Sequence, residues 1–410
     1  MKPVVGQVTH MRTLLAIALL VASSATALAQ STGGGPPENV RMRIGPLYVN
    51  PTIALSNAGQ DTNVFDEATN PKTDFTVTIS PGTDLWLRFG PTWFQSNIKE
   101  DLVWFNKYAS ERSANNSYNV KWTVPLSRLT LTPTWSYVNT RERPGFEIDA
   151  RAQRNDVVYG GTVDFRFLSR TSVVAEARRS TTDFDKATVF LGANLHDELN
   201  RTATSVSLGL KHQITPLTSF TVAAASQQDR FDFDALRNSE SRSITAGIKF
   251  DPAALIKGSA TFGYRDFKPA SSALPGYQGS TAAVDLTYVL LGTTKFAVTA
   301  TRDVQYSFDI NQPYYVATGG AASVSQQLFG PLDVVGRAGL QRMEYRDRIG
   351  AVVAMSDRID HSTSYGAGLG YHLGRDMRIG FNIDKSRRNS GVETRRYEGM
   401  TYGLAVTYGS

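Results

Sequence analysis

The chain has 410 residues, 20% of them charged, and no cysteine, so a disulfide-stabilised scaffold and a disordered tail are both excluded. Its formal net charge is +6 at pH 7. The long apolar run, residues 14–22, is too short for a membrane-spanning helix, which needs about 20 apolar residues.

Residues 1–29 have the pattern of a cleaved secretory signal. Lys2 and Arg12 precede the apolar run, and Ala27-Leu28-Ala29 forms a small-x-small cleavage site. Residues 30–43 then form a flexible periplasmic lead-in. Secretion excludes nucleic acid as the partner of the positive charge. We expect the basic residues to meet outer-membrane lipid and lipopolysaccharide, an anionic polysaccharide, or acidic residues across a lumen.

Connections that alternate between short and long follow a first strand at residues 47–55. Short turns are predicted at 90–91, 125–128, 169–170, 215–217, 251–252, 292–293, 330–331 and 374–375. Longer polar loops are predicted at 57–72, 109–117, 141–154, 184–199, 231–239, 268–279, 307–312, 346–360 and 389–394. Short turns on one rim and long loops on the other are typical of outer-membrane barrels.

The last strand, residues 399–408, shows the period of two most clearly. Large side chains alternate with small or hydroxyl ones, and the large set is Met400, Tyr402, Leu404, Val406 and Tyr408. Large apolar residues toward lipid and small ones toward a lumen characterise transmembrane β-strands. The sequence therefore predicts an all-β fold, a single transmembrane antiparallel up-and-down β-barrel of about 18 strands over residues 44–410, in the outer membrane of a Gram-negative cell.

Three short segments carry a family resemblance: Pro51-Thr52-Ile53-Ala54-Leu55, Asp61-Thr62-Asn63-Val64-Phe65 and Ser80-Pro81-Gly82. With the C-terminal strand they resemble the start and end of the β-barrel porin 2 family. The resemblance implies an outer-membrane barrel, and some members are linked with exopolysaccharide export. Such barrels commonly end on an aromatic residue, whereas here Gly409 and Ser410 follow Tyr408.

The alternation also assigns charged side chains to the lumen, because a charge on the lipid face costs about 2–4 kcal/mol near the midplane. Each charged side chain either forms a structural ion pair with a neighbour along the wall or acts on passing solutes. We expect Arg166, Lys249 and Arg378 to lie in water. The predicted inward basic residues are Arg166, Arg178, Lys211, Lys249, Arg265, Lys295, Arg337 and Arg378. The predicted inward acidic residues are Asp164, Glu176, Asp285, Asp303, Asp333 and Asp384.

Motifs for catalysis or cofactor binding are missing from the sequence, so we expect no enzyme and no cofactor. Two acidic pairs, Asp183 with Asp185 and Asp232 with Asp234, are weak calcium candidates because no glycine-turned ligand loop surrounds them. We predict no metal site.

Two function classes remain from the sequence. The first is a porin-like channel for small solutes or for an exopolysaccharide, with polysaccharide or export machinery as partners. The second is a non-conducting structural barrel, or one whose loops bind a glycan or a partner. A barrel of this strand number leaves water inside, which favours the channel.

Overall fold

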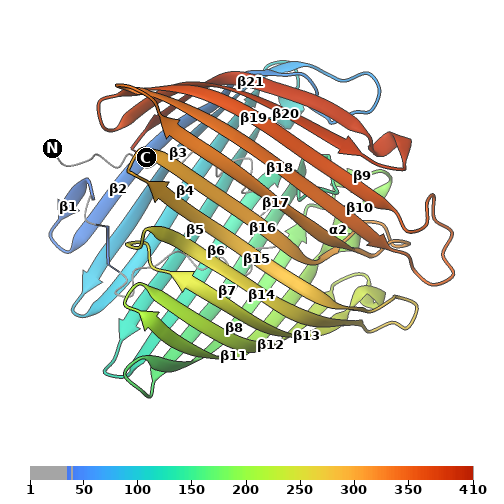
Figure 1. Ribbon diagram of the computed structural model, residues 1–410. Coiled ribbons are helices and arrows are strands. Elements are labelled where there is room, and N and C mark those ends of the chain that lie inside the picture. The colour runs from blue at the N-terminus through green and yellow to red at the C-terminus, as the bar shows by residue number, and fades with distance from the viewer. Residues whose placement is uncertain (1–34, 38–39, 410) are drawn as a thin grey trace.

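The computed structural model describes residues 35–37 and 40–409, and it is an antiparallel β-barrel (Figure 1). Its main sheet has 19 strands, of which β1 (Met42–Ile44) pairs only with β2. The other 18 form the wall, which closes where β2 pairs with β21. The predicted fold and strand number are confirmed. The predicted signal peptide and much of the lead-in lie outside the described residues.

Each wall strand pairs with its sequence neighbours. The wall strands are β2 (Leu47–Asp61), β3 (Asp74–Phe89), β4 (Thr92–Phe105), β5 (Ser113–Pro125), β6 (Leu129–Glu142), β7 (Ala152–Arg166), β8 (Thr171–Phe184), β11 (Arg201–Thr215), β12 (Thr218–Phe231), β13 (Ser239–Phe250), β14 (Ile256–Pro269), β15 (Tyr277–Leu290), β16 (Thr294–Tyr306), β17 (Tyr314–Gln327), β18 (Leu332–Arg346), β19 (Ile359–Leu373), β20 (Met377–Asn389) and β21 (Tyr397–Tyr408).

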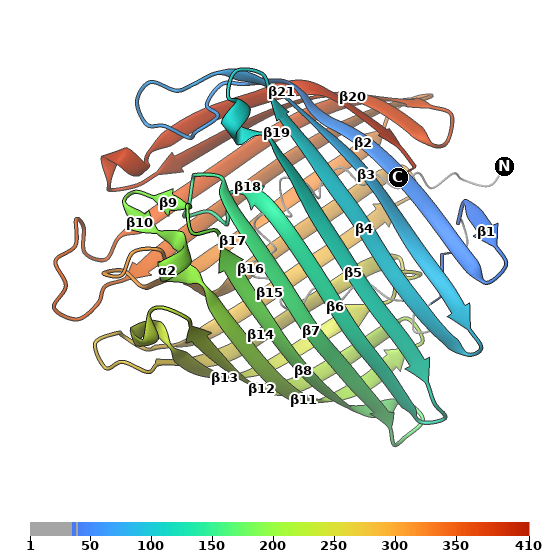
Figure 2. The ribbon, with the colours of Figure 1, turned by 180° about the vertical axis from the view of Figure 1, so that it is seen from behind.

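The predicted turns and loops fall at opposite ends of the barrel, as the sequence indicated (Figures 1 and 2). Glycine at positive φ occupies several of the short turns, including Gly90, Gly330 and Gly374, where other residues would be strained. The long loops carry the remaining elements. These are η1 (Ala109–Glu111), β9 (Val189–Phe190), β10 (Ala193–Asn194), α2 (Leu195–Leu199), η2 (Ala235–Arg237) and η3 (Glu393–Arg395).

The two faces of the wall follow the predicted alternation. Ile244 and Phe381 are 65% and 48% exposed on the outer face, while their small or polar neighbours face inward and are more covered. Among the described residues, no helix is long and apolar enough to cross a membrane.

One part of the wall departs from this alternation. β15 pairs with β16 only from Ala282 to Leu290, while β16 and β17 stay paired to their ends. Beyond the split, Tyr306 packs against Phe231 and Phe267, and its hydroxyl lies 2.5 Å from that of Ser239. The β16–β17 end is therefore tucked against the inner side of β12–β14, which buries side chains that strict alternation would expose to lipid.

Candidate functional site: the lumen and its extracellular mouth

Several ion pairs on the inner wall join strands that are not direct neighbours. Lys211 on β11 contacts Asp164 on β7, across β8. The guanidinium of Arg265 on β14 donates to Asp303 on β16 at 2.8 Å, across β15. Because the inner face of a barrel is concave, side chains from alternate strands converge over the strand between them.

The same arrangement occurs twice over β19. Arg337 on β18 donates to Asp384 on β20 at 2.8 and 3.0 Å, and Arg378 on β20 donates to Asp333 on β18 at 2.6 and 2.7 Å. Gly366 lies beneath the first pair, and a Cβ there would overlap the Asp384 carboxylate. Glycine on the middle strand therefore makes room for an ion pair above it.

The other predicted lumen residues differ in their depth along the wall and in their exposure. Arg166 lies at the short-turn end and donates to the Ser127 carbonyl at 3.2 Å. Glu176, Arg178, Lys249, Asp285 and Lys295 share the inward parity of their strands. Arg378, predicted to lie in water, is instead buried at 6% exposure because its partner Asp333 is also buried. The effect of these charges on solutes stays a prediction.

The loop between β6 and β7, residues 143–151, crosses the mouth of the barrel at the long-loop end. We call it the crossing loop. It contacts Arg388 on β20, although five wall strands, β5, β4, β3, β2 and β21, separate β6 from β20 the shorter way round. Glu147 of this loop also accepts a hydrogen bond of 2.6 Å from Ser307, in the β16–β17 loop. A segment that reaches both places must span the opening.

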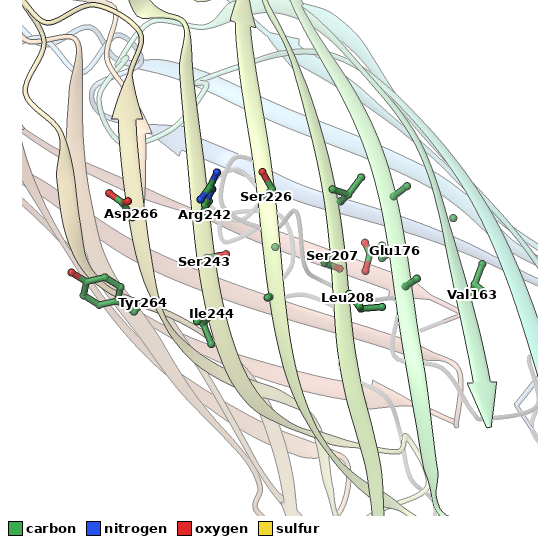
Figure 3. A pocket seen from close by; sticks show the side chains of 16 residues that line it. Val163, Glu176, Ser207, Leu208, Ser226, Arg242, Ser243, Ile244, Tyr264 and Asp266 are labelled. Atoms are coloured by element: carbon green, nitrogen blue, oxygen red, sulfur yellow. The ribbon is translucent and has the colours of Figure 1, made fainter. Parts of the chain in front are cut away.

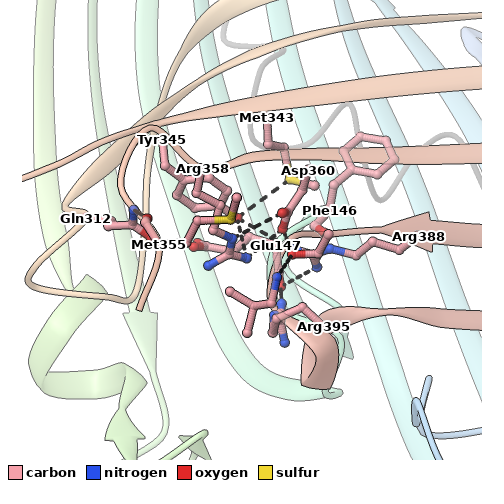
Figure 4. A network of polar contacts seen from close by, with 12 residues as sticks. Phe146, Glu147, Gln312, Met343, Tyr345, Met355, Arg358, Asp360, Arg388 and Arg395 are labelled. Carbon is pink, nitrogen blue, oxygen red and sulfur yellow. Dashed lines mark hydrogen bonds and ion pairs between the residues drawn. The ribbon is translucent and has the colours of Figure 1, made fainter. Parts of the chain in front are cut away.

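Three arginines gather at the centre of the crossing loop (Figure 4). Arg388 of β20 and Arg395 of η3 contact the loop directly, and Arg358, just before β19, joins them through Asp360. Together with Glu147, Asp149 and Asp360 they form what we call the mouth cluster; the arginines are Arg358, Arg388 and Arg395.

Arg388 makes the largest number of these contacts. It donates to the carbonyls of Phe146 and Glu147 at 2.9 and 3.0 Å, and it pairs with Asp149 at 3.0 Å and Asp360 at 2.5 Å. Its side chain is almost fully buried. Removing it would leave buried carboxylates short of a partner.

The neighbouring arginines complete the mouth cluster. Arg395 pairs with Asp149 at 2.9 Å and donates to the Glu147 carbonyl, while Arg358 pairs with Asp360 at 2.5 Å. Each acidic side chain that Arg388 contacts therefore has a second cation beside it.

An apolar cluster fixes the crossing loop from another side. Ile148, 4% exposed, packs with Phe308, Phe190 of β9 and both leucines of α2, Leu195 and Leu199. Figure 2 shows β9, β10 and α2 gathered at this end of the barrel. Burial of these side chains stabilises the loop by the hydrophobic effect, about 1.5–3 kcal/mol for each large one.

Arg237 in η2 ties two further loops together. It is almost fully buried, pairs with Glu198 of α2 at 2.7 Å and with Asp234 at 2.9 Å, and donates to the Ser307 carbonyl. The ion pair with Arg237 occupies Asp234, one of the weak calcium candidates. The Asn200 amide donates at 2.5 Å to another, Asp183.

Three carboxyl groups at the mouth lie where ionisation is costly, and Asp149 is one of them because burial raises its pKa. Burial raises the pKa of Glu147 above its usual range, although its hydrogen bond from Ser307 opposes the shift. Burial also raises the pKa of Asp66 to about 7, and its 3.1 Å ion pair with Arg143 of the crossing loop only partly offsets this. All three groups therefore bind protons more readily when the loop is docked.

The predicted loops contain the mouth residues, but their sequence pattern does not show that these residues meet. Arg143, Glu147 and Asp149 all stand in the loop predicted at 141–154, and Arg388 stands beside the one predicted at 389–394. The repeated arginines of these loops were a signal of ion pairing, but nothing in their spacing indicated the partners.

The family described as "Putative beta-barrel porin 2" matches residues 36–409. The chain belongs to this family. A search of curated proteins finds no match to this porin.

Several solved porin structures are similar to this one. A BenF-like porin from Pseudomonas fluorescens Pf-5 has 11% identity and a TM-score of 0.49, with 89% of this chain and 98% of that chain covered. OccK2 (OpdF) from Pseudomonas aeruginosa has 11% identity and a TM-score of 0.45, with 88% and 97% covered. The outer membrane protein opdK from Pseudomonas aeruginosa has 11% identity and a TM-score of 0.44, with 88% and 98% covered.

Family and fold together make this protein a porin-like β-barrel channel of the outer membrane. They indicate a channel rather than an enzyme. The long loops then lie outside the cell and the short turns in the periplasm.

Proposed function

We propose that this porin is a passive channel for small polar solutes, and that the crossing loop narrows its extracellular mouth. The observation that carries the proposal is the contact of the crossing loop with Arg388 and Ser307 on distant parts of the wall. Barrels of 16–18 strands leave an aqueous interior, so the narrowest place is where a loop crosses it.

Small solutes fit this mouth better than a polymer does. An exopolysaccharide strand would have to pass the crossing loop continuously, which requires the buried contacts of Arg388 and Ile148 to stay broken during export. A small solute needs only the space beside the loop or a brief opening. We therefore favour passage of small solutes over export of exopolysaccharide.

Single-channel recording in a planar bilayer tests the proposal. Replacing residues 144–150 by two glycines removes the centre of the crossing loop, and we expect conductance to rise several-fold. Shortening residues 350–354, where Val352 is 93% exposed, is the matched control and leaves conductance unchanged. Folding of each variant is checked by the shift in electrophoretic mobility on heating.

Two results would contradict the proposal. If neither the folded natural protein nor the folded loop variant conducts, the barrel is a structural or binding protein. If the loop variant passes a long anionic polysaccharide into the bath and the natural protein does so equally, the mouth does not select for small solutes.

A further inference from the structure

A groove lies on the outer wall between β7 and β14 (Figure 3). Its volume is about 840 Å³, and its floor is made of small outward residues on neighbouring strands. Those residues are Gly161, Ala175, Ala177, Ala224 and Ser226. Larger side chains, among them Leu208, Ile244 and Tyr264, stand beside this floor and give it depth.

The register of the strands shows how the groove runs. Gly161 is opposite Ala177, Ala177 opposite Val206, Val206 opposite Ser226, and the row continues to Arg242 and Asp266. On β7 this row lies in the half of the strand nearer the periplasm, whereas on β13 and β14 it lies near the extracellular ends. The groove therefore rises obliquely through the membrane, from an apolar lower end to a polar upper end.

Two arginines flank the upper part of the groove. Arg242 lies at its extracellular end (Figure 3), and Arg179 lies one outward position above Ala177 on β8. Both are exposed on the outer face, and within the described part of the chain neither makes a hydrogen bond or an ion pair with another residue, although Asp266 lies opposite Arg242 on β14 and partly balances its charge. A lone arginine facing lipid costs about 2–4 kcal/mol at the midplane and less toward the interface, so an anion there would be stabilising.

Other cations near the groove differ from Arg179 and Arg242 because each forms an ion pair with a carboxylate. Lys268 lies 3.0 Å from Asp266, and Arg230 lies 3.0 Å from Glu240, all at the extracellular ends of β12–β14. Among the described residues of this surface, Arg179 and Arg242 thus keep guanidinium donors available to an external anion.

We infer that this groove binds a phosphorylated glycolipid of the outer leaflet, a lipopolysaccharide. Its phosphate groups pair with Arg179 and Arg242, and an acyl chain lies over the small residues below. Guanidinium groups suit phosphate because they offer several donors in one plane. This inference rests on the outer-membrane location and not on the proposed channel activity.

A second copy of the barrel is a poorer occupant of the groove. A two-fold contact places the same surface of both copies together, so Arg179 and Arg242 of one copy would lie against those of the other. Two pairs of like charges in an apolar interface are destabilising, whereas phosphate neutralises them.

Native mass spectrometry of the mature protein in non-ionic detergent tests the inference. The probes are bis-phosphorylated lipid A and the same lipid without its phosphates. We expect the protein to retain the phosphorylated lipid at least tenfold better, and the double variant R179A/R242A to lose this preference. Arg387→Ala, an exposed cation on β20 far from the groove, is the matched control and keeps it.

Filling the groove with a large side chain provides an independent test of lipid binding. Ala224→Trp should reduce lipid retention about tenfold, while Ala246→Trp, exposed on β13 outside the groove, should not. Equal retention of the two lipids would overturn the inference. Displacement by excess inorganic phosphate would show a site for the anion alone, and a change of oligomeric mass in Ala224→Trp with lipid retained would show an interface between copies; either result overturns it as well.

Discussion

Replacing Arg388 by alanine should open the extracellular mouth. The side chain is almost fully buried, pairs with Asp149 and Asp360, and donates to two carbonyls of the crossing loop. Breaking a buried ion pair costs about 3–5 kcal/mol. We take the lower value, about 3 kcal/mol, because Arg395 and Arg358 stay beside the two carboxylates. This cost reduces the ratio of docked to undocked loop by roughly 100-fold.

Single-channel recording measures the result directly. We expect Arg388→Ala to spend more time at a higher conductance level than the natural protein. Arg387→Ala is the matched control, since the adjacent side chain is exposed on the outer face and should change nothing. A folded Arg388→Ala barrel with unchanged conductance and unchanged gating would refute the idea that this arginine holds the mouth closed.

Three further predictions concern the mouth, the wall and the lumen. Burial raises the pKa of Glu147, and that of Asp66 to about 7, so the docked loop binds more protons than the undocked loop. Docking should therefore strengthen as pH falls from about 7 toward 4. We expect conductance to be higher at pH 8 than at pH 5. Gly366→Ala should destabilise the unheated barrel by about 1.5–3 kcal/mol, the range for a hydrogen bond to a charged group, whereas Gly336→Ala, with no atom near its Cβ, should not. Lys249→Glu should move the reversal potential in a salt gradient toward cation preference, because this side chain faces the lumen.

Each of these predictions has a distinct contradicting outcome. The pH effect should weaken when Glu147→Gln and Asp66→Asn are combined, although Asp149 still titrates, so an undiminished effect would assign it to other groups. Equal heat resistance of the two glycine variants would mean that the Arg337–Asp384 pair adapts to the added Cβ. An unchanged reversal potential in folded Lys249→Glu would place the selective element elsewhere.

The strands and turns could be predicted because a membrane wall imposes a strict period. Lipid on one side and a lumen on the other force each strand to alternate, and a one-residue slip would expose charges to lipid. Residues such as Lys249 beside Ile248 therefore fix the register locally.

Contacts across the mouth have no such period. The bond between Glu147 and Ser307 joins residues that are 160 positions apart, and its existence depends on the shapes of two loops. The tucked β16–β17 end escaped prediction for the same reason. Tyr306 has the parity of a lipid-facing residue, and only the early end of β15–β16 pairing lets it turn inward.

The distribution of charge suggests where selectivity arises. On the inner wall, Arg265, Arg337 and Arg378 each lie within 3.0 Å of a carboxylate, so their fields largely cancel over a short distance in water. If the crossing loop narrows the mouth as proposed, solutes pass there within a Debye length of the protein, where salt screens its charges least. A channel built this way should select by the width and charge of its mouth more than by its wall. Substitutions in the mouth cluster should therefore change solute preference more than substitutions of the paired wall residues, and bilayer recordings that compare Arg388→Ala with Arg337→Ala decide between the two.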